Sequence, residues 1–269
     1  MRQPVRIAAI QMISGPDVAP NLHDADRLIG QAAGEGAKLV VLPEYFPLIG
    51  ASDADRLLAR ESEGAGPVQD FLAMAAAKHG VWLVGGSLPM MADDPGKMRN
   101  ACLVFDDAGR RIARYDKIHL FAFRKGAEAY DEAATIEPGH DPVAFDSPFG
   151  RIGLAVCYDL RFPELFRALG EVDLLVIPAA FTETTGRAHW DLLVRTRAVE
   201  NQCYAVAAAQ GGRHPTGRLT HGNSMIVDLW GKVLARLDKG EGVIVAELDP
   251  RRIAEVRSSL PALKHRKLK

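Results

Sequence analysis

The chain has 269 residues, with 33 Lys and Arg against 34 Asp and Glu, so its formal net charge at pH 7 is −1. This balance gives no electrostatic reason to expect a nucleic acid or a membrane surface as a partner. No apolar run is long enough to cross a membrane, and the first residues lack the pattern of a secretory signal. Three cysteines are too few for a disulfide framework, which favours a reducing compartment. We therefore expect a soluble, cytoplasmic protein.

Short apolar runs alternate with helical patterns along the whole chain. In the first half, buried strands are predicted at residues 5–12, 38–42 and 81–84. Helical apolar spacing separates them at about 22–32 and 68–75, and glycines follow both helical segments.

Two hairpins and further strands and helices follow. Residues 101–105 and 111–115 flank a glycine turn, as do 224–227 and 232–235. Further strands are predicted at 152–156, 172–177, 203–209 and 242–248, and further helices at 163–169, 190–200 and 250–258. This interleaving favours an α/β fold with helices covering mixed sheets. No linker or composition break divides the chain, so we expect one domain over residues 1–269.

Residues 126–140 form the longest weakly patterned segment and carry many charges. Loops of this length in compact domains are often functional. A solvent-exposed loop without a functional role explains the pattern equally well.

Several common site motifs are absent. The chain has no glycine-rich dinucleotide or phosphate-binding motif, no H-E-x-x-H, no C-x-x-C and no G-x-S-x-G. His189, His214 and His221 lack metal-ligand spacing, so we expect them to be surface or hydrogen-bonded histidines. These absences leave nucleotide binding and a metal site without support from the sequence.

Glu44 directly follows the apolar run at 39–42. Its carboxylate is predicted to lie at the end of a sheet with little solvent around it, where it can act as a general base. Taken alone, a loop cap or an ion pair with an arginine explains the residue better.

Lys117 lies near the end of a predicted hairpin strand among apolar neighbours. A fixed ammonium group there can stabilise negative charge that develops on a substrate oxygen. A solvated surface lysine is the more common explanation of such a residue.

Cys157 ends a predicted strand and precedes a helix that opens near Pro163. Backbone N–H groups at that junction can lower the pKa of the thiol, which makes a thiolate nucleophile feasible. Inert buried cysteines are more common, and Cys102 and Cys203 are expected to be of that kind because each lies inside a strand pattern.

Glu44, Lys117 and Cys157 together supply a base, a cation for an oxyanion and a thiol, all at predicted strand ends. That set suits acyl transfer from an amide or a related C–N bond. An unrelated metal-dependent hydrolase is a competing hypothesis, but it lacks support from ligand spacing.

The segments around these three residues resemble the nitrilase superfamily of carbon–nitrogen hydrolases. The resemblance covers roughly residues 5–262 and rests on signatures in the same order and spacing: Leu42-Pro43-Glu44, Lys117-Ile118-His119-Leu120-Phe121, the segment 153–165 around Cys157, Pro178-Ala179-Ala180-Phe181, the segment 186–190 and the segment 197–202.

This resemblance implies an α-β-β-α sandwich that becomes four-layered when two copies dimerise, with the tail at about 250–269 near the dimer interface. It implies that Glu44, Lys117 and Cys157 are catalytic and that neither a metal nor an organic cofactor is needed. The segment 131–139 resembles the one that holds a second active-site glutamate, which makes Glu132 the candidate.

The resemblance also implies a mechanism through a Cys157 thioester, with Lys117 and the backbone N–H of Tyr158 around the oxyanion. Tyr158 and Phe181 are expected to contact the substrate. The most similar branch contains deaminated-glutathione amidase and ω-amidase, whose substrates are amides of small 2-oxo acids. A carboxylate on such a substrate would need a cation, and Arg124, Lys125 and Arg213 are candidates; solvated loop charges are an equally good interpretation of all three.

Two segments depart from the family pattern. Residues 122–126 lack the acidic segment expected after the lysine motif, and Asn223 stands where a histidine is expected before Ser224. Both changes are expected near substrate-facing loops. A nitrile or N-carbamoyl hydrolase with the same triad, or a non-catalytic interaction module, remains an alternative to an amidase.

Overall fold

The computed structural model describes residues 3–126 and 128–268, and its strands form two large mixed sheets and one small one. In the part described, seven strands make the first sheet, in the order β15-β1-β2-β3-β5-β4 with β6 paired to β5. Their bounds are β1 Val5–Gln11, β2 Leu39–Val41, β3 Trp82–Val84, β4 Leu88–Met91, β5 Met98–Phe105, β6 Arg111–Asp116 and β15 Gly242–Leu248.

The second sheet has the order β14-β13-β12-β11-β10-β9. Its central strands β10, β11 and β12 are parallel, and its outer strands pair antiparallel. The bounds are β9 Ala144–Ser147, β10 Gly150–Leu154, β11 Leu174–Ala179, β12 Tyr204–Ala209, β13 Ser224–Val227 and β14 Val233–Leu237.

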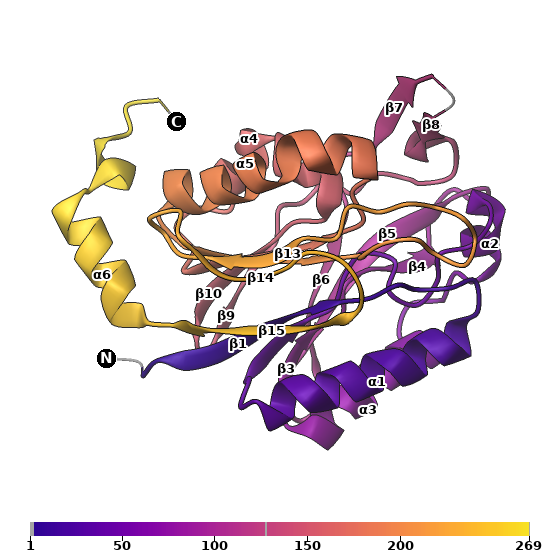
Figure 1. The fold of residues 1–269 in the computed structure, drawn as a ribbon, viewed down its shortest axis with the longest axis horizontal. Helices are drawn as coiled ribbons and strands as arrows, with labels where there is room; N and C mark the ends of the chain where they lie inside the picture. The colour runs from indigo at the N-terminus through magenta and orange to yellow at the C-terminus, as the bar shows by residue number, and fades with distance from the viewer. Residues whose placement is uncertain (1–2, 127, 269) are drawn as a thin grey trace.

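The two sheets pack face to face between two layers of helix (Figure 1). Helices α1 (Val18–Gly34) and α3 (Pro67–His79) cover the outer face of the first sheet. Helices α4 (Pro163–Ala168) and α5 (Glu183–Asn201) cover the outer face of the second. The fold is therefore the α-β-β-α sandwich that the family resemblance implied.

Strand β1 shows how the apolar sequence produces these layers. Ile7 and Ala9 belong to the core between the sheets, whereas Ala8 and Ile10 belong to the core beneath α1 and α3. Because successive side chains of a strand point to opposite faces, a strand buried on both sides needs an unbroken apolar run. The run at residues 5–12 meets that requirement.

Smaller elements surround one end of the sandwich and the C-terminal side. They are α2 (Asp53–Leu58), the hairpin of β7 (Ala122–Lys125) and β8 (Glu128–Asp131), and the 3₁₀ turns η1 (Glu132–Ala134) and η2 (Cys157–Arg161). Helix α6 (Pro250–Ser259) and turn η3 (Ala262–His265) lie beyond the sheets at the left of Figure 1.

Most predicted elements are present, with two kinds of difference. The weakly patterned segment 126–140 contains β8 and η1, and strands β4, β7 and β9 were not predicted. Helix α5 begins at Glu183 rather than near Trp190, because Thr182 caps it by accepting a hydrogen bond from the Thr185 backbone N–H. Among the described helices, none is long and apolar enough to cross a membrane.

Candidate active site

Glu44 lies in the turn that follows β2, and its side chain is 1% exposed. Oε1 accepts hydrogen bonds from Lys117 Nζ at 2.9 Å and from Asn100 Nδ2 at 3.0 Å. The turn packs tightly against Gly86, where a Cβ would lie 2.1 Å from the Pro43 carbonyl oxygen. The sheet end therefore holds this carboxylate in one place, as the sequence predicted.

Lys117 follows β6 directly, and its side chain is fully buried. Besides Glu44, its ammonium group contacts both carboxylate oxygens of Glu132, at 3.0 and 2.8 Å. Burial opposes the charged ammonium, but the charges of Glu132 and Glu44 outweigh it and hold the lysine pKa well above its usual value. The charged form of Lys117 is therefore favoured at neutral pH, and the residue is not a solvated surface lysine.

Glu132 opens η1, inside the segment that the sequence left unpatterned. Its carboxylate also accepts hydrogen bonds from the Tyr45 hydroxyl at 2.8 Å and the Phe121 backbone N–H at 2.7 Å. Burial alone would raise the pKa of this carboxyl group; Lys117 and the other donors outweigh burial, so the pKa is lowered. Glu132 is thus ionised and holds Lys117 in place.

Cys157 begins η2, separated by two residues from the end of β10 at Leu154, with a positive φ of 51°. Such a backbone is uncommon for a residue with a Cβ, and strain of this kind often occurs at reactive positions. Asp159 supports the turn: its fully buried carboxylate accepts hydrogen bonds from the Val156 N–H at 2.9 Å, the Tyr115 hydroxyl at 2.7 Å and the His119 N–H at 3.0 Å.

The expectation that the following helix lowers the pKa of Cys157 is wrong. Burial and then the negative charge of Glu44 raise the thiol pKa well above its usual value, and Lys117 opposes them only in part. Helix α4 starts six residues after the sulfur, beyond the 3₁₀ turn. The resting thiol is therefore protonated, next to the Glu44 carboxylate that is its hydrogen-bond partner.

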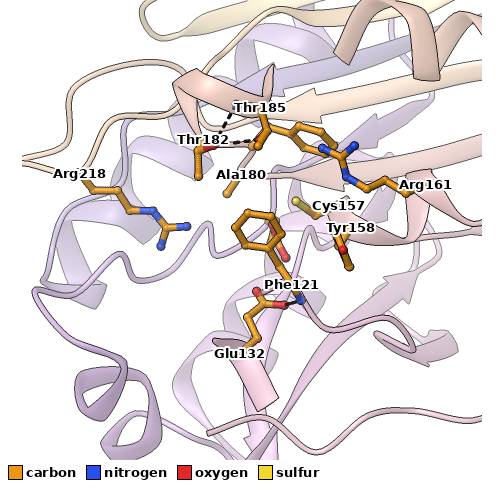
Figure 2. Close-up of a pocket in the computed structure, with 11 residues that line it drawn as sticks. Phe121, Glu132, Cys157, Tyr158, Arg161, Ala180, Thr182, Thr185 and Arg218 are labelled. Carbon is orange, nitrogen blue, oxygen red and sulfur yellow. Dashed lines mark hydrogen bonds between the residues drawn. The ribbon is translucent and has the colours of Figure 1, made fainter. Parts of the chain in front are cut away.

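A pocket of about 290 Å³, counting the open space at its mouth, joins these residues. Figure 2 shows Cys157 and Glu132 facing it. It is lined by Glu44, Phe121, Glu132, Cys157, Tyr158, Arg161, Ala180, Phe181, Thr182, Thr185 and Arg218. Tyr158 and Phe181, predicted to contact substrate, are thus both in the lining.

The cations predicted to face the substrate are not part of this lining. Arg124 and Lys125 are exposed on β7, at the edge of the small hairpin, and Arg213 is exposed on another loop. Two other arginines, Arg161 and Arg218, line the pocket instead, and the sequence analysis predicted no role for either. Arg161 could have been predicted from the sequence, because it follows Cys157 by four residues in the same turn, η2. Arg218 lies in an irregular loop, and no sequence pattern indicates that it reaches the pocket.

Asn223 does not face the pocket either. It has a φ of 60°, and its side chain accepts hydrogen bonds from Arg236 and donates one to the His221 carbonyl oxygen. Asn tolerates left-handed backbone better than most residues, which accounts for it at this turn.

Two of the three histidines, His214 and His189, are hydrogen-bonded as expected, whereas the Nδ1 of His221 is buried without a hydrogen-bond partner among the described residues. His214 is buried between the Ser14 carbonyl oxygen at 2.9 Å and the Thr220 hydroxyl at 2.8 Å. His189 contacts Arg161, and His221 lies near Glu183. Within residues 3–126 and 128–268, no cluster of three or more His, Cys, Asp or Glu side chains could hold a metal ion. The buried Cys102 and Cys203 have no part in the pocket.

Comparison with known proteins agrees with this geometry. The family model for carbon–nitrogen hydrolases matches residues 6–258. The chain belongs to that family. This hydrolase is 40% identical over 270 residues to the deaminated glutathione amidase of Synechocystis sp., with 98% of each chain covered. It is 37% identical to the omega-amidase NIT2 of Danio rerio, with 97% of this chain and 94% of that protein covered.

Solved structures place the hydrolase in the nitrilase superfamily. Saccharomyces cerevisiae Nit3, a member of branch 10 of that superfamily, matches with a TM-score of 0.88 at 33% identity, covering 99% of this chain and 97% of that one. A mutant amidase from Nesterenkonia sp. AN1, with acrylamide added at its active-site cysteine, matches with a TM-score of 0.79 at 27% identity and covers 96% and 98%. The chain is accordingly an enzyme, an amidase of the nitrilase superfamily.

Proposed function

We propose that the protein hydrolyses the amide of a small carboxylate-bearing acid, with Cys157 as nucleophile, Glu44 as general acid and base, and Lys117 as oxyanion stabiliser. The observation that carries the proposal is the meeting of these three groups: the thiol and the ammonium both contact the Glu44 carboxylate, and the thiol and that carboxylate line one pocket. The whole chain, residues 1–269, is proposed to act as a single hydrolase domain.

The first half of the reaction acylates the enzyme. Glu44 takes the proton of the Cys157 thiol, and the sulfur forms a bond to the amide carbon. The C=O electron pair moves onto oxygen, where Lys117 and the Tyr158 backbone N–H stabilise the charge. When the tetrahedral intermediate collapses, the C–N bond breaks and Glu44 returns the proton to the leaving amine.

The second half releases the acid. Glu44 takes a proton from a water molecule, and the resulting hydroxide bonds to the thioester carbon. Lys117 again faces an oxyanion. Collapse breaks the C–S bond, and the thiolate recovers the proton from Glu44, so the net reaction consumes one water and yields a carboxylic acid and an amine. Glu132 keeps Lys117 charged and fixed throughout.

The acyl group is proposed to be that of a small 2-oxo dicarboxylic acid. The relatives named above are a deaminated glutathione amidase and an omega-amidase. Arg161 supports an anionic acyl group, since its guanidinium lines the pocket and its Nε is buried without a hydrogen-bond partner among the described residues. Nitrile and N-carbamoyl substrates are less well supported, because these relatives are amidases.

The experiment is a product assay on purified protein. 2-Oxoglutaramate, a nitrile and an N-carbamoyl compound are incubated with wild type and with Cys157→Ala, and ammonia and carboxylate are measured. The proposal predicts that wild type hydrolyses the 2-oxo acid amide and that Cys157→Ala does not. Cys102→Ala is the control variant and should be fully active. Faster hydrolysis of the nitrile or the carbamoyl compound would overturn the proposed substrate class.

The protein is further proposed to be a cytoplasmic homodimer joined through the outer face of α5, with the tail at about 250–269 close to the interface. Support comes from three large apolar side chains exposed around a shallow groove there, Leu192, Val199 and Trp230. Contiguous exposed apolar surface of this kind commonly marks a protein interface. The three free cysteines suit a reducing compartment.

A further inference from the structure

Asn100 is a polar residue on a face of strand β5 that is otherwise apolar. Two and four residues further along, Cys102 and Val104 belong to the core between the sheets, and the alternation of side chains puts Asn100 on the same face. The residue is 1% exposed. Burying an amide costs free energy unless its polar atoms are hydrogen-bonded, so the partners of Asn100 indicate why the residue is there.

Asn100 contacts two of the proposed catalytic residues, one through its side chain and one through its backbone. Its Nδ2 donates a hydrogen bond to Glu44 Oε1 at 3.0 Å. Its carbonyl oxygen accepts a hydrogen bond from the backbone N–H of Lys117 at 3.0 Å. Lys117 Nζ donates to the same Glu44 Oε1 at 2.9 Å, so the three residues are joined in a closed set of hydrogen bonds. Strand β5 thus sets where the carboxylate and the ammonium lie relative to each other.

The oxygen of the same amide group makes no contribution to the fold. Asn100 Oδ1 is buried and has no hydrogen-bond partner among the residues that the structure describes. A buried carbonyl group without a partner destabilises a protein, and a leucine of similar shape would avoid that cost. The amide cannot turn round to present Oδ1 to Glu44, because a carboxylate accepts hydrogen bonds and has none to donate. The asparagine is therefore explained by the donor that it offers to Glu44.

Oε1 of Glu44 accepts two donors that keep their protons, the amide of Asn100 and the ammonium of Lys117. From this arrangement we infer that Asn100 is a positioning residue: with Lys117 it occupies Oε1, so that Glu44 exchanges its proton through Oε2. The S–H bond of Cys157 then breaks as an O–H bond forms at Oε2, and the same proton passes to the leaving nitrogen when the C–N bond breaks. This inference rests on the proposed function and assigns the atom through which its general base acts.

The test measures kcat and KM for 2-oxoglutaramate with wild type, Asn100→Leu and Asn201→Leu. Leucine has nearly the shape of asparagine but no donor. Asn201 is the matched control, because it is another buried asparagine, 5% exposed. Its side chain donates to the Arg197 carbonyl oxygen and accepts from Arg167, and none of these three residues lines the pocket.

We expect Asn100→Leu to lower kcat about 10- to 100-fold, the range for a lost hydrogen bond to a charged group. KM should change less than about threefold, because Glu44 lines the pocket and Asn100 does not. Asn201→Leu should unfold at a lower urea concentration than wild type and keep its kcat within about threefold. An unchanged kcat in Asn100→Leu, or an equal loss of kcat in both variants, would overturn the inference.

Asn100→Asp keeps the shape of the side chain and tests the donor itself. Two carboxyl groups side by side in a buried site retain one proton between them at moderate pH, because their negative charges repel. That proton supplies a donor to Oε1 of Glu44, and its loss at higher pH removes the donor. The kcat of Asn100→Asp should therefore be highest at the acid end of its pH profile and should fall at a lower pH than that of wild type. A profile parallel to that of wild type would overturn the inference.

The wild-type assay separates this inference from the proposed function. Absent hydrolysis of 2-oxoglutaramate by wild type would overturn the proposed function, and the inference with it. Hydrolysis by wild type together with an unchanged kcat in Asn100→Leu would overturn the inference alone.

Discussion

Lys117 Nζ lies 2.8 Å from Glu132 Oε2 and 3.0 Å from Glu132 Oε1. The ammonium group is thus hydrogen-bonded to both oxygens of a carboxylate that belongs to a different element. Glu132 belongs to a short turn at the end of the β7–β8 hairpin, whereas Lys117 follows a strand of the first sheet. With Glu44 on its other side, Lys117 is balanced between two negative charges. The charge state of the site therefore depends on Glu132.

Glu132→Gln should lower kcat/KM about 10- to 100-fold and change its pH dependence. Removing this negative charge lowers the pKa of Lys117, which Glu132 and Glu44 hold up against burial. Because Lys117 stabilises the oxyanion only when protonated, activity should be lost at a lower alkaline pH than in wild type. A pH profile of kcat/KM measures the shift, and Asp131→Asn is the control. An unchanged alkaline limb would contradict this role for Glu132.

Alkylation of Cys157 by iodoacetamide should be slow at pH 7 and should accelerate steeply up to at least pH 9. The reason is the raised thiol pKa, caused by burial and by Glu44. Glu44→Gln removes a negative charge that raises this pKa, so its alkylation profile should move to lower pH even though turnover falls at least 100-fold. Cys157→Ala corrects for background labelling. If the alkylation rate of wild type no longer rises with pH below pH 7, the resting thiol is ionised and the prediction is contradicted.

The apolar pattern predicted an α/β fold with helices covering mixed sheets, and it placed Glu44, Lys117 and Cys157 at or near strand ends, while the family resemblance supplied the sandwich and the catalytic roles. Lys117 directly follows β6, whereas Glu44 and Cys157 are each separated by two residues from the end of a buried strand, and the ends of such strands can be located from apolar runs. Glu132 was assigned only through the family resemblance, because η1 has no periodic pattern. The thiol pKa was predicted in the wrong direction: it depends on how deeply the sulfur is buried and on its distance from Glu44, and neither can be read from spacing.

The substrate-facing cations show a similar limit. Arg124 was one of three candidate cations for the substrate carboxylate, but it is exposed on β7 and lies outside the pocket lining. Arg218 reaches the pocket from a loop about 100 residues further along the chain, held partly by the hydrogen bond between His214 and Thr220. Contacts of this kind depend on tertiary packing.

His214 should make the folded state sensitive to mild acid. Burial lowers its pKa to about 4, whereas an unfolded histidine titrates near 6.5. Between these values the unfolded chain binds the extra proton, so the stabilisation present above about pH 6.5 is lost as the pH falls towards 4, by up to about 3 kcal/mol. Urea denaturation at pH 7.5 and 4.5 measures this loss. His214→Gln should lose less stability over that interval than wild type or the exposed control His23→Gln; equal losses in all three would contradict the prediction.

Leu192→Glu and Trp230→Arg should each convert the proposed dimer to monomer. Both introduce a charge into the exposed apolar groove on α5, which opposes burial against a second copy. Light scattering after size-exclusion chromatography gives the molar mass. Leu58→Glu, at a side chain that is 87% exposed and outside this groove, is the control. A monomeric wild type, or dimers that survive both changes, would contradict the α5 interface.

Mass spectrometry of the quenched reaction tests the central claim most directly, since a thioester on Cys157 is the one species that the whole mechanism requires. Wild type is mixed with excess 2-oxoglutaryl amide, stopped in acid within the first turnovers and digested. The mechanism predicts the mass of the acyl group, without the amine, on the peptide that contains Cys157, and no such adduct in Cys157→Ala. Continued hydrolysis by Cys157→Ala, or acylation of a different residue, would contradict it.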